Sequence, residues 1–217
     1  MTERLDRDFY RRDALTLARA LVGKTLVKRT EHGTLAAVVT ETEAYPGVGD
    51  PASHAYGGRR TARTETMYRE GGYAYVYLIY GLYSCMNVTA AEDGNPEAVL
   101  IRAAVPIEGH DALWDNLLCT SRRKTAPVRP AVGDMAAWAR LLDGPGRLCC
   151  AFGITKADNA RDLTGDDFFF RDDGFIPREI LCRPRVGIDY AGEAKEWPYR
   201  FTAGSADGIP LFDPPLA

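Results

Sequence analysis

The sequence has 217 residues, of which 46% are hydrophobic and 26% are charged, and its net charge is −3. This length suits a single domain, and no apolar run approaches the roughly 20 residues that a membrane-spanning helix needs. The five cysteines include no CxxC pair and no His-Cys cluster, so we expect buried free thiols rather than disulfides or a zinc site. The start of the chain is rich in charge and lacks a signal-peptide pattern, which predicts an intracellular protein that is not secreted.

The first half of the chain predicts helices on either side of two strands. In chain order the elements are a helix at 12–23, strands at 24–30 and 34–45, a loop at 46–60 and a short helix at 61–70. Apolar residues recur at helical spacing in the first helix, with Asp13 as its N-cap and Gly23 just past its end. The loop contains two prolines and four glycines, which interrupt regular structure.

The second half of the chain mixes strands and helices. The elements are strands at 72–80 and 82–90 that meet at Gly81, a strand at 97–106, helices at 108–118, 132–142 and 144–154, and strands at 166–172, 183–189 and 198–204. Because these elements do not alternate in a βαβ rhythm, they favour an α+β fold with a largely antiparallel sheet. We expect residues 1–217 to form one domain. The Gly-rich start of the last helix either faces a phosphate or is a plain helix N-terminus, and it lacks both nucleotide-loop motifs.

Charged residues are distributed unevenly along the chain. The net charge lacks the basic excess that is typical of nucleic-acid-binding proteins. Two segments are basic: 57–69 contains Arg59, Arg60, Arg63 and Arg69, and 120–130 contains Arg122, Arg123, Lys124 and Arg129. Acidic residues gather in 164–174. The distribution is compatible with a basic face on a mildly acidic body.

The strand that ends at Tyr45 carries a candidate site. Glu41, Glu43 and Tyr45 alternate, so their side chains share one face of the strand. That face either points to water or is functional, because burying two carboxylates is unfavourable unless they are paired. Arg102 interrupts an apolar strand and needs an acidic partner, either in a structural salt bridge or beside a working carboxylate. His54, in the following loop, is either a structural histidine or part of a cleft.

The segment 71–87 is rich in aromatic rings. It contains Tyr73, Tyr75, Tyr77, Tyr80 and Tyr83. These rings either fill a core or form a surface on which flat ligands stack, because a buried tyrosine needs a partner for its hydroxyl. Tyr80 precedes the turn at Gly81, where a ring can protrude as a wedge between nucleic-acid bases.

Four motifs follow one another along the chain. They are VTETEAYPGVGDPASHAYGGRRTART, MYREGGYAYVYLIYGLYSCMNV, AVLIRAAVP and GPGRLCCAFGI. In their order and spacing they resemble the alkyladenine (3-methyladenine) DNA glycosylase family, and the resemblance runs from about Leu5 to Ala203. It implies a single-domain fold with a curved, largely antiparallel sheet and a protruding β-hairpin. It also implies an enzyme without metal or cofactor that flips damaged purines out of double-stranded DNA.

The resemblance implies roles for individual residues. Glu43 matches the family's general base, and Arg102 matches the arginine beside the catalytic water. The walls of the pocket for the flipped base correspond to Tyr45, His54 and Tyr77. Asn87 matches the asparagine that excludes normal guanine by a clash with its exocyclic amine.

Further residues match the surface that meets the DNA. Tyr80 corresponds to the finger that enters the minor groove and fills the gap in the base stack. We assign Tyr75 a supporting role near the pocket, and Tyr73 and Tyr83 roles in packing. The candidates for DNA backbone contacts are Arg59, Arg60, Arg63, Arg122, Arg123 and Lys124.

The implied reaction is hydrolysis of the N-glycosidic bond of alkylated or deaminated purines, which leaves an abasic site. No lysine occurs in the four motifs, which predicts a monofunctional enzyme that forms no Schiff base and does not cleave the strand. We expect a monomer in the cytoplasm or at the nucleoid.

Two other interpretations remain. A non-catalytic module could stack nucleic-acid bases on its tyrosines, but it leaves Glu43 and Arg102 unexplained. A carbohydrate-active enzyme could use Glu41 and Glu43 as a carboxylate pair, but such a pair normally flanks its bond from opposite sides.

Overall fold

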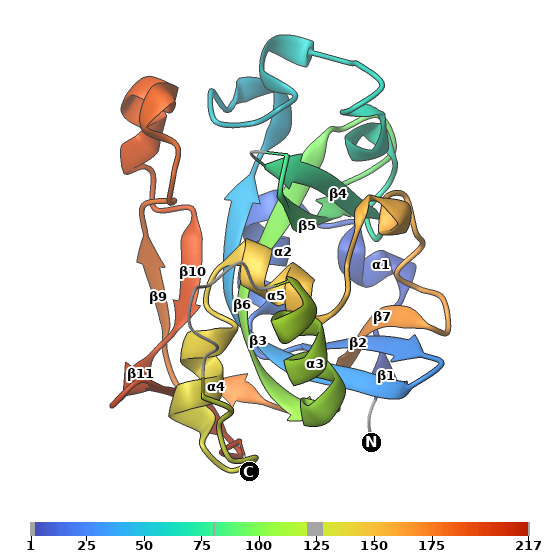
Figure 1. Cartoon of the computed structure of the whole chain (residues 1–217). Coiled ribbons are helices and arrows are strands. Elements are labelled where there is room, and N and C mark those ends of the chain that lie inside the picture. The colour runs from blue at the N-terminus through green and yellow to red at the C-terminus, as the bar shows by residue number, and fades with distance from the viewer. Residues whose placement is uncertain (1–2, 80, 121–127, 217) are drawn as a thin grey trace.

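An antiparallel sheet organises the chain, as the computed structural model shows for residues 3–79, 81–120 and 128–216 (Figure 1). The strands of this sheet are β1 (Glu3–Arg4), β2 (Thr25–Thr30), β3 (Gly33–Tyr45), β4 (Ala74–Ile79), β5 (Tyr83–Ala90), β6 (Glu97–Glu108), β7 (Phe168–Asp172), β9 (Ile180–Arg183) and β10 (Arg200–Ala203). In the described residues the order is β1-β7-β2-β3-β6-β5-β4, and β10, with β9 beside it, pairs with the end of β3. Together with the helices, this sheet confirms the predicted α+β class.

Short helices and two small strand pairs complete the described chain. The α-helices are α1 (Arg7–Tyr10), α2 (Ala14–Leu21), α3 (His110–Thr120), α4 (Met135–Leu141) and α5 (Pro145–Ala151). The 3₁₀ segments are η1 (Gly47–Gly49), η2 (Tyr56–Gly58), η3 (Glu65–Tyr68), η4 (Lys156–Asp158) and η5 (Asp189–Glu196). The small pairs join β8 (Ile176–Pro177) to β13 (Phe212–Asp213) and β11 (Ser205–Ala206) to β12 (Ile209–Pro210).

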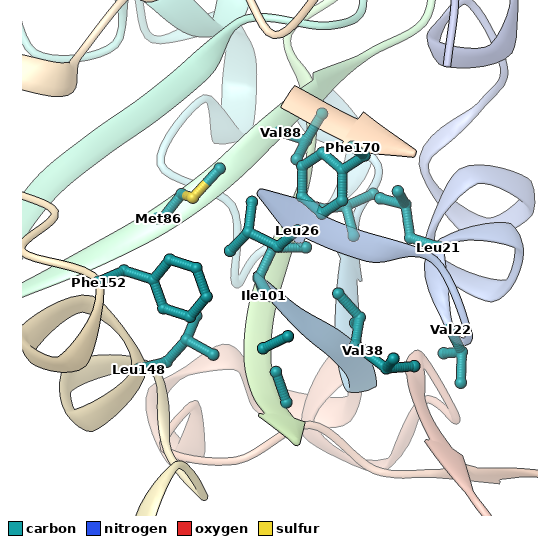
Figure 2. Close-up of a cluster of buried hydrophobic side chains, with 14 of the residues drawn as sticks. Leu21, Val22, Leu26, Val38, Met86, Val88, Ile101, Leu148, Phe152 and Phe170 are labelled. Carbon is teal, nitrogen blue, oxygen red and sulfur yellow. The ribbon is translucent and has the colours of Figure 1, made fainter. Parts of the chain in front are cut away.

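The core lies on one face of the sheet, between the strands and the helices. Helix α2 packs against β3 and β6, and α5 packs against β5 and β6. Figure 2 shows Leu21 of α2 and Phe152, just after α5, on either side of strand residues such as Ile101. Asp13 caps α2 as predicted, because its carboxylate accepts the backbone N–H of Thr16 at 3.0 Å.

Strand β6 is longer than the sequence predicts. The sequence predicts a strand that ends at Pro106, yet β6 continues to Glu108. The pairing between β3 and β6 shifts register between Ala36 and Ala37, opposite Pro106. A proline lacks a backbone donor and is tolerated at such a bulge, which explains why the strand passes through it.

The predicted helix at 61–70 is wrong, since only the 3₁₀ turn η3 forms there. The backbone N–H of Thr61 donates to the Thr64 hydroxyl at 2.8 Å, and the Thr64 N–H donates to the Thr61 carbonyl at 2.9 Å. Threonine hydroxyls that bond to nearby backbone groups compete with a helix in this way.

The predicted strand at 183–189 is also wrong, except at Arg183, where β9 ends. Gly187 has a φ of +76°, which bends the chain away from an extended strand. The backbone N–H of Val186 donates to the carboxylate of Glu43 instead of to a neighbouring strand. This segment is therefore shaped by contacts with a distant side chain.

The cysteines are free thiols, as predicted, but only some of them are buried. Cys85 and Cys149 are buried, whereas Cys119 and Cys182 are exposed. Composition alone does not show on which side of an element a cysteine lies. Among the described residues, no helix is both long enough and apolar enough to cross a membrane.

Candidate active site

A cavity of about 430 Å³ opens on the face of the sheet opposite the core. Its walls come from β3, β4, β5 and β6, from residues between 52 and 67, from Pro145 at the start of α5, and from residues between 186 and 190. Of the residues singled out in the sequence, those that line it are Tyr45, His54, Arg63, Tyr75, Tyr77, Asn87 and Arg102. The volume lies in the range of small-ligand sites. The predicted pocket residues are thus brought together although they lie far apart in the chain.

Glu43 lies directly behind the wall of this cavity. Its side chain is 0% exposed. Three donors hold its carboxylate: the Tyr45 hydroxyl at 2.8 Å, the Val186 backbone N–H at 2.8 Å and Nη1 of Arg102 at 3.4 Å. Burial raises the pKa of Glu43, and Arg102 and the two hydrogen bonds oppose this rise. The result is a carboxylate that is more basic than one in water, with a cation beside it.

Arg102 has the acidic partners that its position requires. Its Nε donates to Glu41 at 2.7 Å, while its Nη1 lies 3.4 Å from Glu43. Glu41 also accepts Nη1 of Arg200 at 3.3 Å, from the neighbouring strand β10. The two carboxylates and two guanidinium groups balance in charge, which is what makes their burial tolerable.

A second buried ion pair ties the two loops of the cavity together. Arg185 and Asp50 are both 0% exposed at their side chains, and Nη2 of Arg185 donates to Asp50 at 2.8 Å. Arg185 also donates to the carbonyl of Ala44 at 2.9 Å and lies 4.8 Å from the centre of the Tyr45 ring. Asp50 precedes His54 in one loop, and Arg185 precedes Val186 in the other, so the pair positions both walls.

Aromatic rings form the remaining wall. The His54 ring lies 4.6 Å from that of Tyr77 at 72°, and its Nδ1 is 2.9 Å from the Tyr75 hydroxyl. Tyr75 and Tyr77 lie on the same face of β4, with ring centres 5.4 Å apart. Tyr75 is almost fully buried and supports His54, in line with its predicted role.

His54 is uncharged at neutral pH. Burial, and next to it the positive charges of Arg63 and Arg59, lower the pKa of His54 to about 4. Burial also raises the pKa of Tyr77 far above its ordinary value, so both rings are neutral. These neutral, electron-rich rings suit a flat and electron-poor ring.

Asn87 lies on the floor of the cavity and is 3% exposed. It stands opposite Tyr75 in the pairing of β4 with β5, and its Nδ2 donates to the Tyr75 carbonyl at 3.1 Å. This bond fixes the plane of the amide. Asn87 therefore presents a rigid polar group to whatever enters the cavity.

Tyr73 and Tyr83, the other described tyrosines of the segment, do not line the cavity. Tyr73 is half-buried, and the guanidinium groups of Arg7 and Arg69 lie over its ring at 4.7 and 5.1 Å. Tyr83 is 37% exposed, although it approaches Gly146 at the start of α5. The packing role predicted for Tyr83 is therefore only partly confirmed.

The predicted basic residues fall into different environments. Arg59 and Arg63 are exposed and line a second cavity of about 450 Å³ beside the first, while Arg60 pairs with Glu65 at 2.6 Å. Only Arg63 of these three also lines the aromatic cavity. The predictions for Tyr80, Arg122, Arg123 and Lys124 lie outside the described residues.

The acidic segment 164–174 lies far from this site in the order of the strands. It contributes β7, which is close to one end of the sheet, whereas β4 forms the other end. Several of its carboxylates are paired: Asp166 with Arg4, Asp167 with Arg161, Asp172 with Lys24 and Asp173 with Arg171. The net negative charge of the chain therefore does not describe the charge of the surface around the cavity.

Sequence reasoning missed the contributions of the segment around 185–190. Arg185, Val186 and Tyr190 all take part in the site, and the Tyr190 hydroxyl donates to the Ala52 carbonyl at 3.3 Å. The signal in the sequence is weak: Arg185 lies between Pro184 and Gly187, within the segment 183–189 that the sequence predicts as a strand. Chemically, the site combines a buried base, a neighbouring cation and a flat aromatic cavity, which suits the activation of water beside a bound ring.

Comparisons with known proteins lead to the same family as the four sequence motifs. Residues 8–206 match the family model described as Methylpurine-DNA glycosylase (MPG). A relative from Desulfitobacterium hafniense (strain Y51) is 43% identical over 199 residues, covering 92% of this chain and 94% of its own. One from Methanocella arvoryzae is 43% identical over 197 residues, covering 91% and 90%. The names of both assign them to the 3-methyladenine DNA glycosylases.

Proposed function

The chain belongs to the methylpurine-DNA glycosylase family, and on that premise we propose how its own residues bind and release a damaged base. The protein is a DNA glycosylase of base-excision repair, a hydrolase of N-glycosyl bonds. The observation that carries the proposal is the buried carboxylate of Glu43, which meets Arg102 at the wall of an aromatic cavity.

Glu43 acts as the general base. The C1′–N9 bond of the nucleotide breaks, the sugar gains oxocarbenium character, and water adds at C1′ while giving a proton to Glu43. Of the three contacts to Glu43, the 3.4 Å contact to Arg102 is the longest, and a water beside this pair could hydrogen-bond to both groups. Arg102, held by Glu41, orients that water, and the negative charge of Glu43 stabilises the sugar cation.

Tyr45, His54 and Tyr77 hold the flipped base. An alkylated purine is electron-poor and often cationic, and attraction to an electron-rich ring is worth about 0.5–2 kcal/mol. The neutral state of His54 supports this role, because a protonated imidazole would repel a cationic base. Asn87 selects among purines: its fixed amide clashes with the 2-amino group of guanine, which adenine and hypoxanthine lack. The same group is present in 7-methylguanine, whose positive charge weakens the glycosidic bond, so this base is released despite the clash.

The turn after β4 supplies the wedge. Tyr80 follows Ile79, which lines the cavity, and the flanking Leu78 and Leu82 are 46% and 51% exposed. A ring at this position would enter the base stack and fill the gap that the flipped nucleotide leaves. Arg59, Arg60, Arg63, Arg122, Arg123 and Lys124 are proposed to contact the DNA backbone.

The enzyme is proposed to be monofunctional. Among the described residues that line the aromatic cavity there is no lysine, which supports hydrolysis without a Schiff base. We further propose that it works as a monomer inside the cell, on alkylated and deaminated purines in duplex DNA.

The two other interpretations fit the geometry less well. A non-catalytic module would gain nothing from a fully buried carboxylate beside an arginine. A glycosidase-like pair is disfavoured because Glu41 is bound by Arg102 and Arg200, away from the cavity wall.

The test is base release from a duplex oligonucleotide that carries 7-methylguanine, followed by alkali to cleave abasic sites. Wild-type protein should release the base, and Glu43→Gln should lower the single-turnover rate constant by roughly 10²- to 10⁴-fold. Glu31→Gln, at a side chain that is 86% exposed, is the matched control and should behave as wild type. A Glu43→Gln rate equal to the wild-type rate would exclude Glu43 as the base.

A further inference from the structure

Arg63 is exposed and lies in a basic loop, yet its guanidinium group contacts the aromatic wall of the cavity. Its guanidinium carbon lies 5.0 Å from the centre of the Tyr77 ring, and its Nη2 lies 3.4 Å from Nε2 of His54. Neither contact involves a carboxylate. The guanidinium group is therefore held against the aromatic wall of the cavity by Tyr77 and His54, and not by an acidic partner.

The contact with His54 has a defined direction. A guanidinium group only donates hydrogen bonds, so Nε2 of His54 must accept, and Nδ1 must carry the ring proton and donate to the Tyr75 hydroxyl at 2.9 Å. Arg63, His54 and Tyr75 thus form an ordered chain. Arg59, four residues earlier, lines only the neighbouring cavity.

A fixed positive charge in this cavity favours the excision of neutral bases over that of cationic bases. When a neutral purine such as hypoxanthine leaves, the electron pair of the C1′–N9 bond stays on the base, which becomes negative until it takes up a proton. A nearby guanidinium group stabilises that charge as it develops. A cationic base such as 7-methylguanine gains the same electron pair on leaving, but Arg63 first repels it when it flips into the cavity, so the two effects cancel relative to the unflipped complex.

We propose that Arg63 is a specificity-determining residue that favours excision of purines that are neutral when bound, because its guanidinium group stabilises the negative charge on the departing base. The proposal rests on the glycosylase function proposed above and assigns the group that assists neutral bases. Arg63 is exposed in the free protein, and duplex DNA over the cavity would exclude the water that screens its charge. This role of Arg63 comes in addition to the contact with the DNA backbone proposed above.

The experiment measures single-turnover excision from two duplexes of the same sequence, one with hypoxanthine and one with 7-methylguanine. Arg63→Met removes the charge and keeps an apolar stem. It should lower the rate constant for hypoxanthine by about tenfold and change that for 7-methylguanine by less than about twofold. Arg63→Lys retains a positive charge and should keep the ratio of the two rate constants within about threefold of wild type.

Arg59→Met is the matched control, because it removes the same charge from the same loop but not from the aromatic wall. It should weaken binding of both duplexes and leave the ratio unchanged. Equal losses on both bases in Arg63→Met, or an equal change of ratio in Arg59→Met, would overturn the proposal. So would a wild-type enzyme that releases 7-methylguanine but not hypoxanthine. Failure of wild type to release either base would instead count against the proposed function.

Discussion

The strands β3, β6, β5 and β4 carry two different surfaces on one backbone. One face holds Ala44, Ile101, Val88 and Val76, all in the main core, and Figure 2 shows Ile101 and Val88 among them. The other face holds Glu43, Arg102, Asn87 and Tyr77, at or behind the cavity. Successive side chains of a strand point to opposite faces, so the two sets alternate in the sequence.

The faces are stable for different reasons. The core face depends on volume and on the removal of apolar surface from water. The cavity face depends on charge pairing, because Glu43 and Arg185 are tolerable only while Arg102 and Asp50 neutralise them. A loss on the first face should lower stability without changing chemistry, and a loss on the second should change both.

The largest effect on stability is expected from breaking the buried pair on the cavity side. Asp50→Asn leaves Arg185 charged and buried, which should lower the free energy of unfolding by roughly 3–5 kcal/mol. The measurement is urea denaturation at neutral pH. Asp166→Asn breaks an exposed pair with Arg4 and should change the free energy by at most about 1 kcal/mol. If the two variants lost equal stability, the buried Arg185–Asp50 pair would contribute no more to stability than an exposed pair.

A somewhat smaller effect is expected on the core face. Ile101→Ala should lower the free energy of unfolding by about 3 kcal/mol, because it leaves a void under the sheet. The excision rate constant, measured below the unfolding transition, should stay within about twofold of wild type. Ile176→Ala, at a side chain that is 67% exposed, is the control for stability. A large loss of excision in Ile101→Ala would show that the two faces are not separable.

A smaller effect is expected on how the free energy of unfolding depends on pH. His54 has a pKa of about 4 in the folded protein and about 6.5 when unfolded, so it stabilises the fold above pH 6.5 and this contribution is lost as pH falls toward 4. Between pH 7.5 and 5, His54→Phe should therefore lose about 2 kcal/mol less stability than wild type. Denaturation curves at both values give the difference. His32→Phe, at a side chain that is 78% exposed, should follow wild type, and a wild-type-like response of His54→Phe would contradict the buried neutral state.

The smallest effect is expected from Asn87→Ser. The shorter side chain removes the group proposed to clash with guanine, so slow release of guanine from undamaged duplex should rise by several-fold, roughly as a difference of 1 kcal/mol allows. The measurement is the accumulation of alkali-labile sites at guanine. Asn95→Ser, in an exposed loop, should leave this background unchanged. If Asn87→Ser released guanine no faster than wild type, Asn87 would not be the group that excludes guanine.

Much of this arrangement could be predicted. The alternation of Glu41, Glu43 and Tyr45 correctly indicated a shared face, and Arg102 in an apolar strand correctly indicated an acidic partner. Both inferences depend on the period of a strand and on the unfavourable burial of an unpaired charge, which are local or nearly local properties. The helix predicted at 61–70 failed because threonine hydroxyls compete for the backbone there.

The sequence by itself determined the fold class, the positions of the main strands and the set of side chains that share a face, because strand period and hydrophobicity are written in neighbouring residues. Only the tertiary structure decided which partners meet that face. Val186 bonds to Glu43 from 143 residues away, and Arg185 reaches Asp50 from 135 residues away. Such contacts depend on how distant loops pack over the sheet, and no local pattern specifies that packing.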